Sequence, residues 1–596
     1  MSVADPLVDV AADLSTGHGS SAAMDVLTEG LLDMRIILMR TVVDTVEKID
    51  PASAARAGLS QAYRALAELK GEQPELVARA LCQPIVGQWA EKVLQRAARE
   101  VVQRAARGPG DAAIPLWADC AYLGWLAAAL AVRCRPVGAA RVVIRGGVVM
   151  LPGLGLARLA DGDYCGDAEV RWNRSGAIGF DWDGGVLDIT SAAEPSQPAW
   201  EPLRSMRARE DEPEIWLDDI DPFRALSPRY AGAPRLDQAQ VDRWRRDLSG
   251  AWELLGDYLP ALRHSLRSVA PLTADPRFDA SSHTDPSGVG CVYTTAAADQ
   301  CQLALTLIHE IQHTKFNLLI DQLELFTPDP QCRFYAPWRD DPRPILGLLH
   351  GIYAFFGVTD FWRAHRFSDC HGSLQAHADF ALWRTQVGGA LRQALGSGLL
   401  SMVGEAFFGN LEAAVRQWSE EDVPAAARIA AEEAATLHQT FWQTRNLVPD
   451  PDGIAELAAR WSAGRPPIAP LPASTLIDQQ HIHETHRGLP LATRLAIIEP
   501  GAANAISGLS DGDHAYLAGY LTEAVSQYSR DLRADPLCPQ AWAGIGLAGR
   551  KIYGELAFRV LRERADVVAR LYEVLGPDTD IPALVRWLSH SAFGMN

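Results

Sequence analysis

Residues 305–313 read Leu-Thr-Leu-Ile-His-Glu-Ile-Gln-His and contain the spacing His-Glu-x-x-His. His309 and His313 are four residues apart, so on a helix they lie on one face, one turn apart. The run before them is rich in Ala, Leu and Gln, and no Gly or Pro follows until Pro328, which predicts a helix. Two imidazoles at this spacing can reach one metal ion, and neutral imidazole suits Zn, Fe, Ni and Cu. A chance match on a solvated helix is the alternative, but the neighbouring residues are mostly apolar.

In zinc peptidases the glutamate of this motif, which is Glu310 in this chain, is the general base. The extended peptidase motif needs Gly and His where this chain has Phe316 and Leu319. Another peptidase form needs a glutamate about twenty residues after the second histidine, where this chain has Cys332 and no acid close by. A third ligand must therefore come from elsewhere. His350, in a predicted apolar helix over 345–356, is the first candidate, ahead of Glu324. The alternative for His350 is an ordinary core histidine.

The composition limits the classes of function. The chain has 596 residues, 48% of them hydrophobic and 22% charged, as in a soluble globular protein of about two to four domains. A net charge of −19 argues against nucleic acid as a partner. We expect neither a secretory signal nor a membrane-spanning segment. The nine cysteines form no CxxC pair, which favours reduced thiols and a cytoplasmic location.

The patterning predicts a mainly α protein with a small antiparallel β insertion. From the N-terminus we expect a disordered segment (1–25), a helical region (26–139), the β insertion (140–200), a helical HExxH metal domain (201–466), a linker-like region (467–510) and tetratricopeptide-like helices (511–596). Residues 200–226 are expected to form a loop, and 290–295 one short strand before the motif helix. A second histidine cluster, at 481–486, is interpreted as a polar loop because its order does not fit HExxH.

The segment 334–344 reads Phe-Tyr-Ala-Pro-Trp-Arg-Asp-Asp-Pro-Arg-Pro. Its three prolines keep the backbone extended, so Arg339 and Arg343 are presented by a stiff loop. Arginines presented in this way suit a carboxylate ligand held through two hydrogen bonds. The alternative is that both arginines pair with their neighbours Asp340 and Asp341.

The HExxH helix, the string Ala-Pro-Trp-Arg-Asp-Asp-Pro-Arg-Pro at 336–344 and Gly-Leu-Leu-His-Gly at 347–351 together resemble the HExxH-motif peptide-modification proteins. These proteins accompany ribosomally made peptide natural products in bacteria. The resemblance runs from about residue 30 to about residue 440 and includes Asp-Ile-Asp-Pro-Phe-Arg at 219–224. It implies an Fe(II)- and 2-oxoglutarate-dependent oxygenase that uses O2 to hydroxylate the β-carbon of a residue in a precursor peptide.

Under this resemblance His309 and His313 are metal ligands, and His350 is the third. Three protein ligands leave positions open for 2-oxoglutarate and O2. Arg343 or Arg339 would bind the distal carboxylate of 2-oxoglutarate, and Glu310 would orient a ligand or hold the substrate. Two alternatives stay open: a zinc peptidase or amidase with Glu310 as base, and a non-catalytic scaffold that binds peptide. The oligomeric state is left open, a homo-oligomer included.

Overall fold

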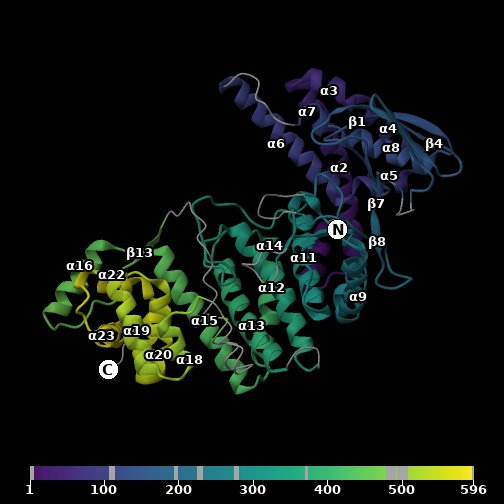
Figure 1. Ribbon diagram of the computed structural model, residues 1–596. Coiled ribbons are helices and arrows are strands. Elements are labelled where there is room, and N and C mark those ends of the chain that lie inside the picture. The colour runs from purple at the N-terminus through teal and green to yellow at the C-terminus, as the bar shows by residue number, and fades with distance from the viewer. Residues whose placement is uncertain are drawn as a thin grey trace, which may run out of the picture. The chain divides into compact units, whose positions relative to one another are not determined.

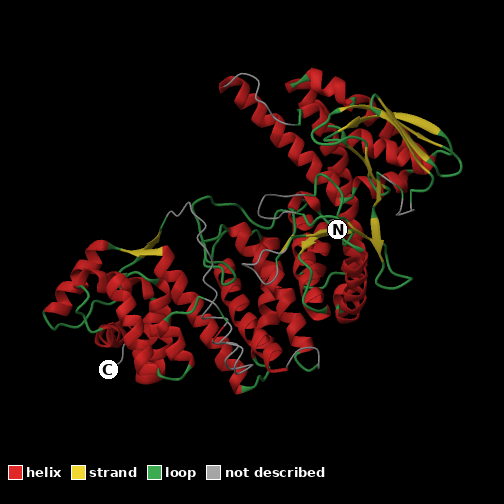
Figure 2. Ribbon diagram, viewed as in Figure 1, coloured by secondary structure: helices red, strands yellow, loops and turns green. Residues whose placement is uncertain are grey.

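The computed structural model is mainly helical, with 60% helix and 12% strand (Figure 2). It describes residues 6–106, 114–192, 197, 199–224, 232–273, 281–368, 373–477, 492, 506 and 508–592. The chain forms two compact units, Met1–Leu323 and Glu324–Asn596. The predicted metal domain, 201–466, is therefore divided between the two units. The mainly α composition with small antiparallel sheets agrees with the sequence analysis.

The first unit begins with eight described helices (Figure 1). They are α1 (Pro6–Leu14), α2 (Ser21–Ile49), α3 (Pro51–Ala57), α4 (Leu59–Glu72), α5 (Pro74–Leu81), α6 (Pro84–Ala106), α7 (Leu116–Asp119) and α8 (Tyr122–Cys134). Their core contains Trp89, Tyr122 and Trp125, all fully buried. The indole of Trp89 donates to the Asp119 carbonyl at 2.7 Å, so this buried polar atom is paired.

The expectation of disorder over residues 1–25 is wrong for residues 6–25, which form α1, a turn and the start of α2. The Ser20 side chain accepts from the Ala23 N–H and caps α2. Asp13 accepts from the Ser20 N–H at 2.7 Å, which fixes the turn. The composition of small polar residues that predicted disorder is also that of helix caps and tight turns.

The β insertion at 140–200 is confirmed and consists of two antiparallel sheets. One has the order β1-β4-β5-β6 and the other β2-β3-β7. Their strands are β1 (Gly138–Ile144), β2 (Val148–Leu151), β3 (Gly155–Arg158), β4 (Gly166–Trp172), β5 (Ile178–Trp182), β6 (Gly185–Ile189) and β7 (Trp200–Pro202). In β4 every second residue is buried, because successive side chains point to opposite faces.

A further sheet, in the order β11-β12-β10-β9-β8, precedes the motif helix. It comprises β8 (Arg204–Met206), β9 (Ile215–Leu217), β10 (Ser268–Pro271), β11 (Ser282–His283) and β12 (Cys291–Thr294). β12 is the strand expected at 290–295. The expectation of a loop over 200–226 is wrong, since β7, β8 and β9 fall there. These strands have three residues each, too few for an alternating pattern to be visible in the sequence.

The helical elements around this sheet are α9 (Gln238–Leu254), the short η1 (Gly256–Tyr258) and η2 (Pro286–Gly288), α10 (Leu259–Ser265) and α11 (Gln300–Ile320). Trp244, Leu248 and Trp252 of α9 are buried, as their helical spacing predicts. α9 packs against α11, which carries the HExxH motif.

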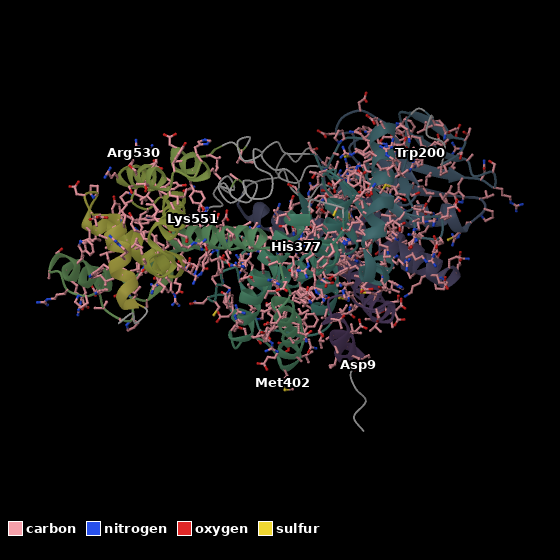
Figure 3. All side chains as sticks on the ribbon, turned by 90° about the horizontal axis from the view of Figure 1, so that it is seen from below. Asp9, Trp200, His377, Met402, Arg530 and Lys551 are labelled. Atoms are coloured by element: carbon pink, nitrogen blue, oxygen red, sulfur yellow. The ribbon has the colours of Figure 1, made fainter. Side chains whose placement is uncertain are left out.

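The second unit is a helical assembly with one small sheet. Its elements are α12 (Ile345–His365), α13 (Ser373–Leu395), α14 (Met402–Ser419), α15 (Ala425–Asn446), β13 (Leu447–Pro449), α16 (Pro451–Ser462), β14 (Ser474–Leu476), α18 (Asp511–Leu517), α19 (Leu521–Ala534), α20 (Pro539–Tyr553), α21 (Glu555–Glu563), α22 (Ala565–Leu575) and α23 (Ile581–Ala592). α13 packs against α12, α14 and α15, and α15 packs against α20. Lys551 of α20, labelled in Figure 3, pairs with buried Glu433 of α15 at 2.7 Å.

Among the helices that the structure describes, α12 is long and apolar enough to cross a membrane. Most of α12 is buried within the second unit, which is also typical of the core helix of a soluble protein. Most of the linker-like region 467–510, with the histidine cluster at 481–486, lies outside the described residues.

Candidate functional site

The motif helix α11 begins at a side-chain cap. The carboxylate of Asp299 accepts from the Gln302 N–H at 2.8 Å, which satisfies one of the free donors at a helix start. Most of α11 between Cys301 and Leu319 is buried, whereas His309 and His313 are half-buried. The predicted helix is thus present, and the motif lies within the packed part of the first unit.

The structure brings His309 and His313 together on one face of α11. Their Nε2 atoms are 3.2 Å apart, and the two rings stand at 84° to each other. Two imidazole nitrogens at ~2.1 Å from one metal, at angles between octahedral and tetrahedral, would be about 3.0–3.4 Å apart. In the absence of metal the same distance lets one ring donate a hydrogen bond to the other. The separation of the two nitrogens is therefore compatible with a shared metal ion.

The environment of His309 favours the neutral ring. Burial lowers the pKa of His309, and the nearby Glu310 carboxylate opposes this shift only in part. A metal ligand must be unprotonated, so the lowered pKa removes the competition from protons near neutral pH.

Glu310 does not face open solvent. Its residue is 2% exposed, and its Oε2 accepts from the Thr284 hydroxyl at 2.5 Å. The same hydroxyl lies 3.3 Å from the Glu310 carbonyl oxygen. Thr284 follows β11 directly, so the motif glutamate is anchored to the end of this strand. Sequence reasoning missed Thr284, because nothing in a lone threonine 26 residues upstream signals a partner for the motif.

Lys315, which lies on α11, is a second residue that the sequence analysis missed. Its ammonium group is fully buried and donates to the carbonyl oxygens of Gly17 and His18, both at 2.8 Å. Burial lowers the pKa of Lys315 to about 7. The ring of Tyr258 lies 5.6 Å from the ammonium, within reach of a cation–π interaction. Lys315 thereby fastens the turn before α2 to the helix of the motif.

His350 and the two candidate arginines belong to the second unit. His350 lies on α12 and is half-buried. Burial, and then the charge of Arg343, lowers the pKa of His350 to about 4, so its imidazole is neutral at physiological pH. Neutrality fits a metal ligand, and it fits a core histidine equally well.

The proline-rich loop packs on α12 through two glycines. Phe334 and Arg343 close the loop with two backbone hydrogen bonds, of 2.8 and 3.0 Å. A Cβ at Gly347 would lie 2.8 Å from the Arg343 Nε, and a Cβ at Gly351 would lie 2.1 Å from the Trp338 indole. The string Gly-Leu-Leu-His-Gly thus gives the loop room to lie against the helix that carries His350.

Both candidate arginines are engaged within the loop. Arg339 and Arg343 donate to Asp341 at 2.9 and 3.0 Å, and all three side chains are partly exposed. The expected alternative, pairing with neighbouring acids, is thus observed for Asp341. Asp340 is held differently: its carbonyl accepts from Asn446 at 2.8 Å.

A chain of polar contacts behind the loop was not foreseen. The Tyr335 hydroxyl lies 2.9 Å from His438 Nδ1, and His438 Nε2 lies 3.6 Å from the Asp340 carboxylate. Tyr335 also packs edge-on against Trp442. His438 and Trp442 lie on α15, so this chain joins the loop to that helix.

Within the described residues, no group of three or more His, Cys, Asp and Glu side chains is arranged to hold a metal ion. The predicted ligands are divided, with His309 and His313 in the first unit and His350 in the second. No protein-family model matches this chain, and no curated protein matches it.

Proposed function

We propose that the chain is an Fe(II)- and 2-oxoglutarate-dependent oxygenase that hydroxylates the β-carbon of a residue in a ribosomally made precursor peptide. The observation that carries the metal assignment is the 3.2 Å separation of the His309 and His313 Nε2 atoms. The lowered pKa of His309, caused mainly by burial, supports it. The choice of reaction rests on the resemblance of residues 336–351 to the peptide-modification proteins.

The burial of Glu310 supports an oxygenase over a peptidase. A peptidase needs the motif glutamate as a general base at the water bound to zinc. Here Oε2 of Glu310 is occupied by the Thr284 hydroxyl, and the residue is buried. In the proposal Glu310 is a positioning residue that fixes the motif helix relative to β11.

The remaining roles follow from the chemistry of the side chains. His350 is proposed as the third ligand, since its neutral ring can donate an electron pair. A bound iron ion would couple the oxidation of 2-oxoglutarate by O2 to hydroxylation of the peptide. Arg343, or Arg339, would hold the distal carboxylate of 2-oxoglutarate by exchanging it for the Asp341 carboxylate, which is partly exposed. The helices of residues 511–596, from α18 onward, are proposed as a tetratricopeptide-like end that either caps the neighbouring helices or binds the peptide.

Metal binding is the first test. The full chain, stripped of metal, is titrated with Co(II) as a spectroscopic substitute for Fe(II) under anaerobic conditions. We expect one site, lost in His309→Ala and in His313→Ala. His264→Ala is the matched control, because His264 lies in the same unit, outside the motif, and pairs with Asp25 at 3.1 Å. Binding that survives both motif variants contradicts the metal assignment.

Turnover is the second test. Iron-loaded protein is given 2-oxoglutarate, air and a candidate precursor peptide, and succinate and peptide mass are measured. Succinate that depends on peptide, with one oxygen atom added to the peptide, is the expected result. Loss of both in His350→Ala supports the third ligand. Cleaved peptide with zinc, abolished in Glu310→Gln, would favour the hydrolase instead, and neither product would favour a peptide-binding scaffold.

A further inference from the structure

A shallow groove of about 500 Å³ lies on the first unit, beside the last strand of the five-stranded sheet. One wall is the end of β8 and the other is α9, which are labelled in Figure 1. The lining residues are Ser205, Met206, Arg207, Arg245, Arg246 and Ser249. None of them is a proposed metal ligand or cosubstrate residue.

The free edge of β8 turns backbone hydrogen-bonding groups toward this groove. Ser205 lies opposite Trp216 of β9 in the antiparallel register. The Trp216 N–H donates to the Arg267 carbonyl on the other side of β9, at 3.0 Å. Trp216 and Ser205 are therefore a non-hydrogen-bonded pair, in which the backbone groups of both residues point away from each other. The N–H and C=O of Ser205 consequently face the groove and are available to a further strand.

The groove is also a concentration of positive charge on a chain of net charge −19. Arg245 pairs with Asp242 at 3.3 Å, and Arg207 donates to the Glu212 carbonyl at 2.9 Å. The carboxylate of Glu214 lies 3.9 Å from Arg207. Arg207, Arg245 and Arg246 are all exposed.

Arg246 is the least engaged of the three arginines. Across the part of the chain that the structure describes, its guanidinium makes no hydrogen bond or ion pair. Three exposed guanidinium groups beside an open strand edge present donors to an anionic ligand, and only two are partly neutralised by acids.

The walls of the groove are held in place. The Ser249 hydroxyl donates to the Ala208 carbonyl at 2.5 Å and ties α9 to the end of β8. Buried Asp219 binds Arg204 at 3.0 Å and also Arg235, so the other end of β8 is fastened as well. A ligand would therefore meet a preformed edge and would spend little free energy on ordering it.

We propose that this groove binds an extended acidic peptide segment, which adds to β8 as a further strand. The peptide backbone would pair with the N–H and C=O of Ser205, and acidic side chains at alternate positions would reach the arginines. Charge complementarity selects this occupant, because an acidic segment is repelled by most of a chain of net charge −19 and attracted here. The inference goes beyond the proposed oxygenase and requires no metal.

The test uses the full chain without metal. The probe is a fluorescent heptapeptide with glutamate at alternate positions and threonine between, followed by fluorescence anisotropy. We expect saturable binding that weakens as salt rises. Arg246→Glu should weaken it about three- to tenfold, since one attraction becomes a repulsion. Arg174→Glu is the matched control, an exposed arginine on the turn between β4 and β5 of another sheet, and should leave affinity unchanged.

Strand addition is tested on the peptide, so that no protein variant needs to fold. N-methylation of the peptide at the positions that pair with Ser205 should weaken binding roughly tenfold, and methylation of the intervening positions should not. Equal binding of both methylated peptides overturns strand addition. Absence of binding, or wild-type affinity in Arg246→Glu, overturns the site itself. Neither result bears on the metal titration, so the two proposals fail separately.

Discussion

Removing the Thr284 hydroxyl should destabilise the protein more than removing the Glu310 carboxylate, to which that hydroxyl donates a hydrogen bond. Thr284→Val changes the shape of the side chain little but leaves Oε2 of Glu310 without its 2.5 Å donor. Glu310 is only 2% exposed, so water cannot easily replace that donor. A hydrogen bond to a buried charged group contributes about 1.5–3 kcal/mol, and we expect this loss in the free energy of unfolding.

The reverse substitution should have a smaller effect. In Glu310→Leu the Thr284 hydroxyl keeps a second acceptor, the main-chain carbonyl of residue 310 at 3.3 Å. The leucine also suits the buried helix α11. We therefore expect a loss below about 1 kcal/mol. Adding Glu310→Leu to Thr284→Val should recover most of the stability, because the double variant contains no unpaired carboxylate.

Urea denaturation of the full chain, followed by far-ultraviolet circular dichroism, measures all four proteins. Thr306→Val is the matched control: Thr306 is buried on the same helix and its hydroxyl donates to the Gln302 carbonyl at 2.9 Å, so no charged group loses a partner. A Thr284→Val protein within about 0.5 kcal/mol of wild type would refute the reasoning. Glu310 would then be hydrated and available as a base, and the peptidase interpretation would gain.

Three further outcomes follow from packing and charge. Gly351→Ala should destabilise the protein by about 1–3 kcal/mol in thermal unfolding, because its Cβ would meet the Trp338 indole at 2.1 Å. It should also raise the 2-oxoglutarate concentration needed for turnover. An unchanged melting temperature would contradict this contact. Burial raises the pKa of Asp221 to about 8, so the folded state favours its neutral form. The free energy of unfolding should therefore fall as pH rises from about 4 to about 8, by at most roughly 1.4 kcal/mol for each pH unit. Urea unfolding of Asp221→Asn should lack this contribution. Tyr335→Phe removes the 2.9 Å contact to His438 and should lower the free energy of unfolding by about 1 kcal/mol, again measured in urea; no change would mean that this contact adds nothing.

Features that depend on neighbours along the chain were predictable. The spacing of His309 and His313 places two imidazoles on one face of any α-helix, and in the structure their Nε2 atoms are 3.2 Å apart. The strands β1, β2, β4 and β6 of the β insertion were recognisable because they have four to seven residues each between glycine-rich turns. The helix after residue 345 was recognisable from its apolar run.

Features that depend on partners far away in the chain were not predictable from the sequence. The segment 6–25 has a composition typical of disorder, yet Lys315, almost 300 residues away, holds its turn through two carbonyl oxygens. The strands β8 and β9 have only three residues each, and β9 is held between β8 and β10, with which it also pairs. Arg204 of β8 is in turn paired with buried Asp219. No local pattern encodes such partners, because the stabilising contact forms only after the chain has folded back.

The distinction between local spacing and contacts with distant residues also applies to the two reactions proposed for the HExxH helix. The motif itself is compatible with a peptidase and with an oxygenase, because both require two histidines at this spacing. A peptidase requires in addition that Glu310 accept a proton from water. The Thr284 hydroxyl engages only Oε2 and a carboxylate can accept at both oxygens, so what opposes this step is the burial of Glu310, which is 2% exposed. Thr284, which directly follows β11 and lies outside the motif, holds Glu310 in this buried position.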